Sequence, residues 1–147
     1  MAAVAINRAT MDFSLLINPD EWFKFSDEVK YGILSHEGKH LALFHLITMD
    51  MYPNSKMDNI ACDLEINQTI NKSQLPSWGI FIEDFKTKYP NLDWKEHAGR
   101  DHYYKELSKL SDEQKEEIGI DEKAEHHWIV VDGEGNISND PLSDSQK

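Results

Sequence analysis

Two short apolar runs open the chain, Ala3 to Ile6 and Phe13 to Ile17, with polar residues 7–10 between them. Short apolar runs bounded by polar turn residues are typical of strands, so this segment predicts a β-hairpin. Pro19 follows the second run. Because proline lacks a backbone N–H, it favours a turn that closes the hairpin.

A long helix is expected from Ser26 to about residues 46–50. Ser26 is a typical N-cap residue, and Asp27 and Glu28 place negative charge in the first turn, where the helix dipole favours it. Apolar residues lie nearly all round this segment, which predicts a helix that is buried on several sides. They are Val29, Ile33, Leu34, Leu41, Leu43, Phe44 and Ile47.

Ser55 opens a second expected helix, which runs to about Asn71, with Asp58 placed as a capping-box partner. A third helix is expected from residue 101 to about residue 117. Residues 129–131 and 136–138 flank an Asp-Gly-Glu-Gly turn and predict a C-terminal hairpin.

Charge narrows the classes of partner. Acidic residues number 27 against 15 basic ones, which gives a formal net charge of −12. Nucleic-acid backbones and anionic lipids both attract clustered Lys and Arg, so we expect neither a nucleic-acid nor a membrane partner. The single cysteine, Cys62, excludes an internal disulfide. With no long apolar segment and no signal peptide, the sequence predicts a cytoplasmic protein, bacterial or from a phage-infected host cell.

The length of 147 residues predicts one domain. We expect it to span residues 1–131. The remaining segment, residues 132–147, is acidic and is expected to be mobile.

The segment most informative about chemistry is His36-Glu37-x-x-His40, within the first long helix. The two histidines are about one turn apart, so both imidazoles project from one face and can converge on Zn²⁺ at about 2.0–2.1 Å. Glu37 lies about 100° round the helix from His36. It can therefore act as general base toward a zinc-activated water without binding the metal. The alternative is a pair of structural histidines, against which the apolar character of the helix argues.

A catalytic zinc site needs a third protein ligand. Asp63 and Asn67 interrupt the apolar stripe of the second helix, whereas Glu65 faces away from it. Burying an unpaired carboxylate is costly and a cation opposite would remove the cost, so Asp63 is the expected third ligand. The alternative role for Asp63 is to orient a ligand histidine without binding the metal itself. His45 is the second choice. It follows His40 by five residues and points away unless the helix ends first.

These residues resemble a family known as the "putative metallopeptidase domain", often found ahead of a von Willebrand A-like domain in bacteria and phages. Its members pair His-Glu-x-x-His, and a histidine five residues on, with a later Asn-Ile-Ala-x-Asp-x-x-Ile-Asn-Gln. Here these segments are residues 36–45 and 59–68, and residues 101–107 and 127–128 resemble later elements. The resemblance covers roughly residues 10–130. It implies a zincin-like α+β fold and peptidase activity. In this fold we expect a small N-terminal sheet to pack on the metal-bearing helix and the second helix. Gly38 and Lys39 depart from the apolar pair usual between the histidines.

Five other positions are weaker candidates. His126 and His127 would form an auxiliary metal site only if they faced the same way, which adjacent strand residues do not. Tyr103 or Tyr104 would donate to an oxyanion if it lined the site, although core packing is the simpler interpretation. Cys62 is expected to be a small buried residue rather than a zinc ligand.

Together these features predict a zinc-dependent hydrolase, a metallopeptidase that acts on a peptide or protein. The alternative is a non-catalytic zinc-stabilised module with a binding or phage structural role. A helical domain without metal is a third possibility.

Overall fold

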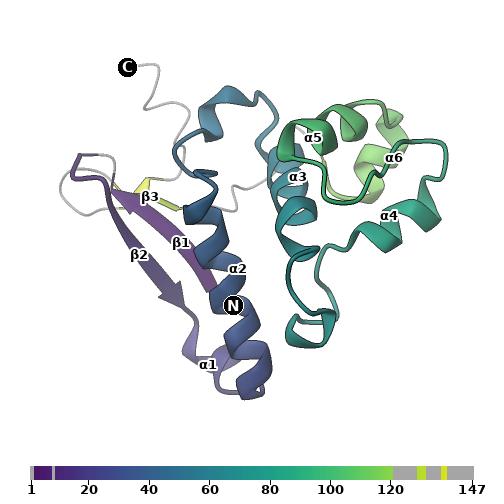
Figure 1. The fold of residues 1–147 in the computed structure, drawn as a ribbon. Coiled ribbons are helices and arrows are strands. Elements are labelled where there is room, and N and C mark those ends of the chain that lie inside the picture. The colour runs from purple at the N-terminus through teal and green to yellow at the C-terminus, as the bar shows by residue number, and fades with distance from the viewer. Residues whose placement is uncertain (1, 8, 121–128, 132–136, 139–147) are drawn as a thin grey trace.

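The structure is a computed structural model that describes residues 2–7, 9–120, 129–131 and 137–138. It has an α+β fold, as predicted, in which a sheet lies on one side of helix α2 and the remaining long helices lie on the other (Figure 1). In chain order the elements are β1 (Ala2–Asn7), β2 (Asp12–Ile17), α1 (Pro19–Trp22), α2 (Asp27–Ala42), η1 (Met49–Met51), α3 (Ser55–Asn67), η2 (Lys72–Gln74), α4 (Ile82–Lys88), α5 (Arg100–Ser108), α6 (Asp112–Glu117), β3 (Ile129–Val131) and β4 (Ile137–Ser138).

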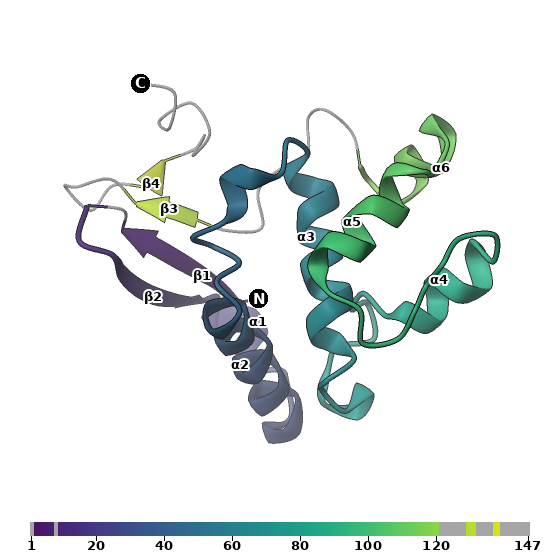
Figure 2. The ribbon, with the colours of Figure 1, turned by 45° about the horizontal axis from the view of Figure 1, so that its top comes forward.

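The sheet has four strands in the order β2-β1-β3-β4 (Figure 2). The predicted N-terminal hairpin is confirmed: β1 and β2 pair antiparallel, with Ala2 opposite Ile17. The C-terminal hairpin is confirmed as well, since β3 and β4 pair antiparallel. Strand β3 joins the two hairpins by pairing parallel to β1. Strand β2 is therefore one edge of the sheet.

The chain leaves β2 through a short helix rather than the predicted simple turn. Asn18 caps this helix by accepting a hydrogen bond from the Asp20 backbone N–H at 3.1 Å. Pro19 occupies the first helical turn, where its missing N–H has no cost.

Helix α2 begins at the predicted cap but is shorter than predicted, since it ends at Ala42 and not at residues 46–50. The chain reverses in a Schellman turn. Phe44 has a left-handed φ of 59°. The backbone N–H of His45 donates to the carbonyl of His40 at 3.0 Å, and that of Phe44 donates to Leu41 at 3.1 Å. His45 therefore folds back toward the helix that it would otherwise have extended.

The prediction that α2 is buried on several sides is wrong. Its buried residues are Gly32, Ile33, Glu37 and His40, whereas Tyr31 and Leu34 are exposed. The buried residues lie on the part of α2 that contacts β1, η2 and α3. An added Cβ at Gly32 would lie 1.8 Å from the Gln74 carbonyl oxygen, so glycine is needed for this close approach.

The main hydrophobic core lies among α3, α4, α5 and the residues on either side of α6, beyond α2 from the sheet (Figures 1 and 2). Its members include the aromatic residues Phe85, Tyr89 and Trp94, while Trp78 is exposed. A second cluster joins β1 to η1 and α3 through Val4, Ile6, Leu46, Met49 and Cys62. None of the buried residues of α2 belongs to either cluster. His36 and His40 contact α3 through polar groups instead.

Two other helices differ from the sequence prediction at their ends. Helix α3 is capped by Asn54, whose side chain accepts from the Met57 N–H, and it ends at Asn67 rather than Asn71. The single helix expected over residues 101–117 is divided into α5 and α6, because Ser111 forms a new N-terminal capping box with Gln114.

None of the helices in the described part of the chain has the length and apolar character needed to cross a bilayer. His126, His127 and most of the segment 132–147 lie outside the described residues.

Candidate metal centre

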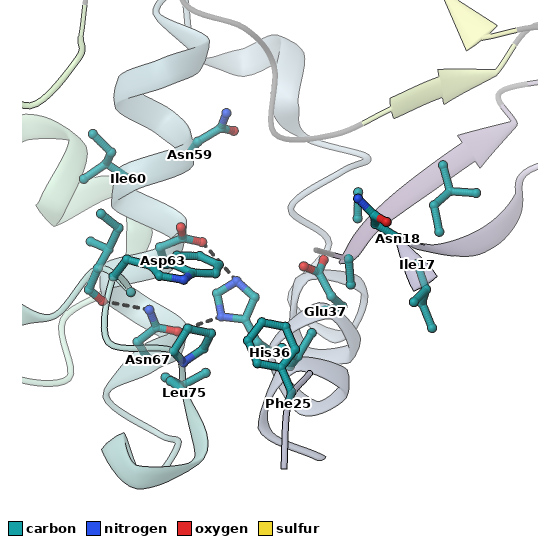
Figure 3. Close-up of a pocket in the computed structure, with 18 of the residues that line it drawn as sticks. Ile17, Asn18, Phe25, His36, Glu37, Asn59, Ile60, Asp63, Asn67 and Leu75 are labelled. Atoms are coloured by element: carbon teal, nitrogen blue, oxygen red, sulfur yellow. Dashed lines mark hydrogen bonds and ion pairs between the residues drawn. The ribbon is translucent and has the colours of Figure 1, made fainter. Parts of the chain in front are cut away.

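Two histidines of α2 and one aspartate of α3 meet at the interface between these helices. His36 Nε2 and His40 Nε2 lie 3.2 and 3.3 Å from the same oxygen, Asp63 Oδ1. The two Nε2 atoms are 2.9 Å apart. Figure 3 shows His36 directed at Asp63 across the space between the helices. The one-turn spacing on α2 and the inward side of α3 thus bring three ligand-type atoms to one point.

The size of this triangle fits a metal ion. Zinc bound at about 2.1 Å with tetrahedral angles holds its ligand atoms about 3.4 Å apart. The three distances of 2.9–3.3 Å are close to that value. Within the described residues, His36, His40 and Asp63 are the group of His, Cys, Asp or Glu side chains that could hold a metal ion.

Asn67 orients the first histidine. Its Nδ2 donates to the Ile80 carbonyl at 2.7 Å, so its Oδ1 faces His36 Nδ1, at 2.6 Å, as an acceptor. His36 Nδ1 must therefore carry the hydrogen, and in the neutral ring Nε2 carries the lone pair. Asn67 thus presents the metal-binding nitrogen of His36 to the cluster.

A chain of hydrogen bonds orients the second histidine. His45 Nε2 lies 2.8 Å from Glu65 Oε1, and a carboxylate only accepts, so this nitrogen carries the hydrogen. In the neutral ring of His45, Nδ1 then carries a lone pair and accepts from His40 Nδ1 at 3.0 Å. His40 Nε2 is left as the basic nitrogen. An outer chain of this kind is typical around metal ligands.

The outer end of this chain is held by α5. The Arg100 backbone N–H donates to Glu65 Oε2 at 2.8 Å. The guanidinium of Arg100 binds both carboxylate oxygens of Asp58, each at 2.6 Å, and both side chains are buried. It also lies 3.5 Å from the His45 carbonyl. The orientation of His40 therefore depends on residues of α3, α5 and the turn after α2.

Glu37 lies beside the cluster and is only 4% exposed. Its Oε2 is buried and has no hydrogen-bond partner among the described residues. Burial raises the pKa of Glu37 to about 7, with the charge of Asp63 acting in the same direction and His36 against it. A carboxyl group with a pKa near neutrality can both accept and release a proton.

For the pKa of His36, the interactions with neighbouring groups outweigh the effect of burial. Burial by itself disfavours its protonated form, but the hydrogen bond and charge of Asp63, with smaller contributions from Glu37 and Asn67, raise its pKa above the usual value. The cluster thus attracts positive charge, whether a proton or a metal ion supplies it.

A cavity of about 840 Å³ opens onto this cluster. His36, Glu37, Asp63 and Asn67 line it together with residues of β1, β2, α3 and the loop after η2 (Figure 3). Its volume is in the range of small-molecule and peptide side-chain sites. The candidate chemical groups therefore face a space that a substrate can enter.

The structure brings His36, His40 and Asp63 together, and His36, Glu37 and Asp63 line the cavity, whereas His40 is fully buried behind them. It does not bring His45, the second choice for third ligand, to the Nε2 atoms, since both of its nitrogens face other side chains. Because α2 ends early, that residue supports His40 instead.

Three further candidates lie elsewhere. Tyr103 is fully buried and its hydroxyl donates to the Lys95 carbonyl at 2.6 Å. Tyr104 accepts from the Asn54 backbone N–H. Cys62 is fully buried, as predicted, with Sγ 3.7 Å from Asp58 Oδ1. None of the three lines the cavity.

Sequence reasoning missed the roles of Asn67 and Glu65. Asn67 left a signal, since it interrupts the apolar stripe one turn after Asp63. Glu65 left none, because its partner His45 depends on the end of α2.

Comparison with known proteins gives one result. No curated protein and no solved structure matches the chain significantly. A family model described as "Putative metallopeptidase domain" matches residues 5–135. This match spans most of the chain and includes His36, Glu37, His40 and Asp63. The chain therefore belongs to this metallopeptidase-domain family.

Proposed function

We propose that the protein is a zinc-dependent peptidase in which His36, His40 and Asp63 bind the metal. The observation that carries this proposal is the convergence of two basic nitrogens and a carboxylate oxygen within about one zinc-ligand spacing. Two neutral imidazoles and one carboxylate are a typical donor set for a catalytic zinc, which also needs an open position. The adjoining cavity supplies that position.

Zinc, when bound, supplies a Lewis acid that polarises a carbonyl and makes water more acidic. Glu37 lies on the same turn as His36 and accepts the proton of the attacking water. It then delivers that proton to the nitrogen of the departing amine. Its burial makes this exchange easier, because the neutral and charged forms are then closer in free energy near neutral pH.

The edge strand β2 is suited to hold an extended peptide. Leu16 and Ile17 of β2 line the same cavity as Glu37. An extended segment can add to an open strand edge by main-chain hydrogen bonds, which leaves its side chains to be read by pockets. A peptide paired with β2 would therefore pass the cluster.

Metal content tests the proposed ligands. The full chain, treated with chelator and reloaded with zinc, is expected to bind one equivalent by elemental analysis. Asp63→Asn and His40→Ala should weaken zinc binding by at least tenfold, since each removes a ligand. His102→Ala and Asp84→Asn are matched controls away from the cavity and should leave binding unchanged. Zinc content near zero in the unaltered chain would contradict the metal site.

Glu37→Gln separates catalysis from metal binding. It should keep zinc but lower hydrolysis of a peptide library by about 10²–10⁴-fold, the usual contribution of a general base. If the unaltered protein binds zinc but cleaves no peptide, the alternative of a non-catalytic zinc-stabilised module is supported instead.

A further inference from the structure

A buried polar atom near the cluster has no role in the proposed chemistry. Asn59 is 5% exposed, and its Oδ1 has no hydrogen-bond partner among the described residues. The residue lines the cavity. Figure 3 shows it on α3, one turn before Asp63 and on the side of the cavity.

An unpaired carbonyl oxygen inside a protein is unfavourable, because it has lost its hydrogen bond to water without gaining another. Such an atom is retained where something else binds it. Since Asn59 faces the cavity, the missing donor is expected to belong to the molecule that fills this space.

The rest of the cavity wall restricts what that molecule can be. Ile33, Ile60, Leu75 and Ile80 line it and offer hydrocarbon. An acceptor within an apolar wall fits a group that combines one N–H with an apolar side chain. A peptide unit next to Leu, Phe or a similar residue has this combination. The side-chain NH₂ of Asn59 can in addition donate a hydrogen bond to the carbonyl of that peptide unit.

The spacing agrees with an extended peptide. Asn59 and Asp63 are four residues apart on α3, about 6 Å along the helix axis. An extended chain advances about 3.3–3.4 Å per residue. A peptide whose carbonyl lies at the cluster therefore brings an N–H near Asn59 one or two residues further along.

We propose that Asn59 is a substrate-binding residue: its Oδ1 accepts the N–H of a peptide unit one or two residues from the bond at the cluster, and the apolar side chain beside that unit occupies the cavity. This inference rests on the proposed peptidase function for the identity of the bound chain. It goes further in assigning the residue and the class of side chain that select the substrate.

The test combines a variant of the protein with a variant of the ligand. Asn59→Leu keeps the shape of the side chain and removes its polar atoms. The probes are blocked hexapeptides with Leu, Phe, Asp or Lys at the centre, and versions of the best binder in which one amide at a time is N-methylated. Binding is measured to zinc-loaded protein that carries Glu37→Gln, so that no peptide is consumed. Asn91→Leu, an exposed position outside the cavity, is the matched control.

We expect the Leu- and Phe-centred peptides to bind best. One N-methylation should weaken binding roughly ten- to hundredfold in the Asn59-containing protein and by less than threefold in Asn59→Leu, because the donor and acceptor of one hydrogen bond are then removed together. With Glu37 intact, Asn59→Leu should lower kcat/KM by a similar factor. Its melting temperature should be unchanged or higher, since no protein hydrogen bond is lost. A merely structural asparagine would lower the melting temperature and show no coupling.

Several results would overturn the inference. Equal N-methylation penalties in both proteins at every position would show that Oδ1 contacts no peptide N–H and holds an ordered water instead. Normal hydrolysis by Asn59→Leu would reject the inference and leave the peptidase proposal standing. If N-methylation and Asn59→Leu are coupled but the unaltered protein cleaves no peptide, the proposed peptidase function is rejected. Asn59 is then supported as a peptide-binding residue. Failure of every hexapeptide to bind would count against both.

Discussion

Replacing Glu37 by glutamine should stabilise the metal-free protein at alkaline pH. The carboxyl group is buried, and its pKa is raised to about 7 from its ordinary value of 4.5. Below pH 4.5 the group is protonated in both the folded and the unfolded chain and has no effect. As pH rises, the unfolded chain releases the proton first, so the free energy of unfolding falls until the folded protein ionises as well.

The gap between the two pKa values sets the magnitude. Each pH unit corresponds to about 1.4 kcal/mol, so Glu37 costs the folded state about 3 kcal/mol at pH 8 and about 1 kcal/mol at pH 5. Glutamine has nearly the same shape and no charge. The free energy of unfolding of Glu37→Gln should therefore exceed that of the unaltered protein by those amounts. At pH 8 this difference corresponds to a melting temperature higher by roughly 10 °C.

Urea unfolding in the presence of chelator, followed by circular dichroism from pH 5 to pH 8.5, measures this difference. Glu83→Gln, at an exposed position on α4, is the control and should show no gain that grows with pH. Added zinc should shrink the gain, since a cation beside Glu37 favours its charged form. A difference that is constant with pH, or that falls as pH rises, would refute the argument that burial controls Glu37.

Three further predictions concern the frame that carries the site. Gly38→Ala should raise the free energy of unfolding by about 1 kcal/mol, because the position is exposed within α2 and an added Cβ meets nothing within 4 Å. Phe44→Gly should also stabilise, by about 1 kcal/mol in urea unfolding, since Phe44 is 61% exposed and has a φ of 59° that suits glycine. Arg100→Met should lower the free energy of unfolding by about 3–5 kcal/mol, because it leaves Asp58 buried without its counter-charge. Adding Asp58→Asn to that variant should recover part of the loss, and full additivity of the two changes would contradict the ion-pair explanation.

Much of the fold follows from local sequence. The apolar runs flanking residues 7–10 predict the β1–β2 hairpin, and the Asp-Gly-Glu-Gly turn predicts the pairing of β3 with β4. Ser26 marks the start of α2 by accepting from the Val29 N–H. In each case the controlling interaction joins residues close in the chain, so the pattern is visible without the tertiary structure.

The end of α2 was not predictable in the same way. Neither glycine nor proline marks the Schellman turn, and Phe44 adopts a conformation that local propensity disfavours. The turn persists because His45 and Leu46 are then buried, the former against Glu65 and the latter against β1. Long-range packing therefore outweighs a local preference for helix.

By itself the sequence determined that two imidazoles share one face of a helix, because their spacing of four residues is close to one helical turn, and that Glu37 lies about 100° round the helix from the first of them. Only the tertiary structure decided which side chain meets them. From the sequence, both Asp63 and His45 were candidates for the third ligand. The packing angle between α2 and α3 sets Asp63 against the two Nε2 atoms, and the early end of α2 turns His45 behind His40. The contacts of Asp63 with the two histidines join residues more than twenty positions apart, and no local pattern encodes them.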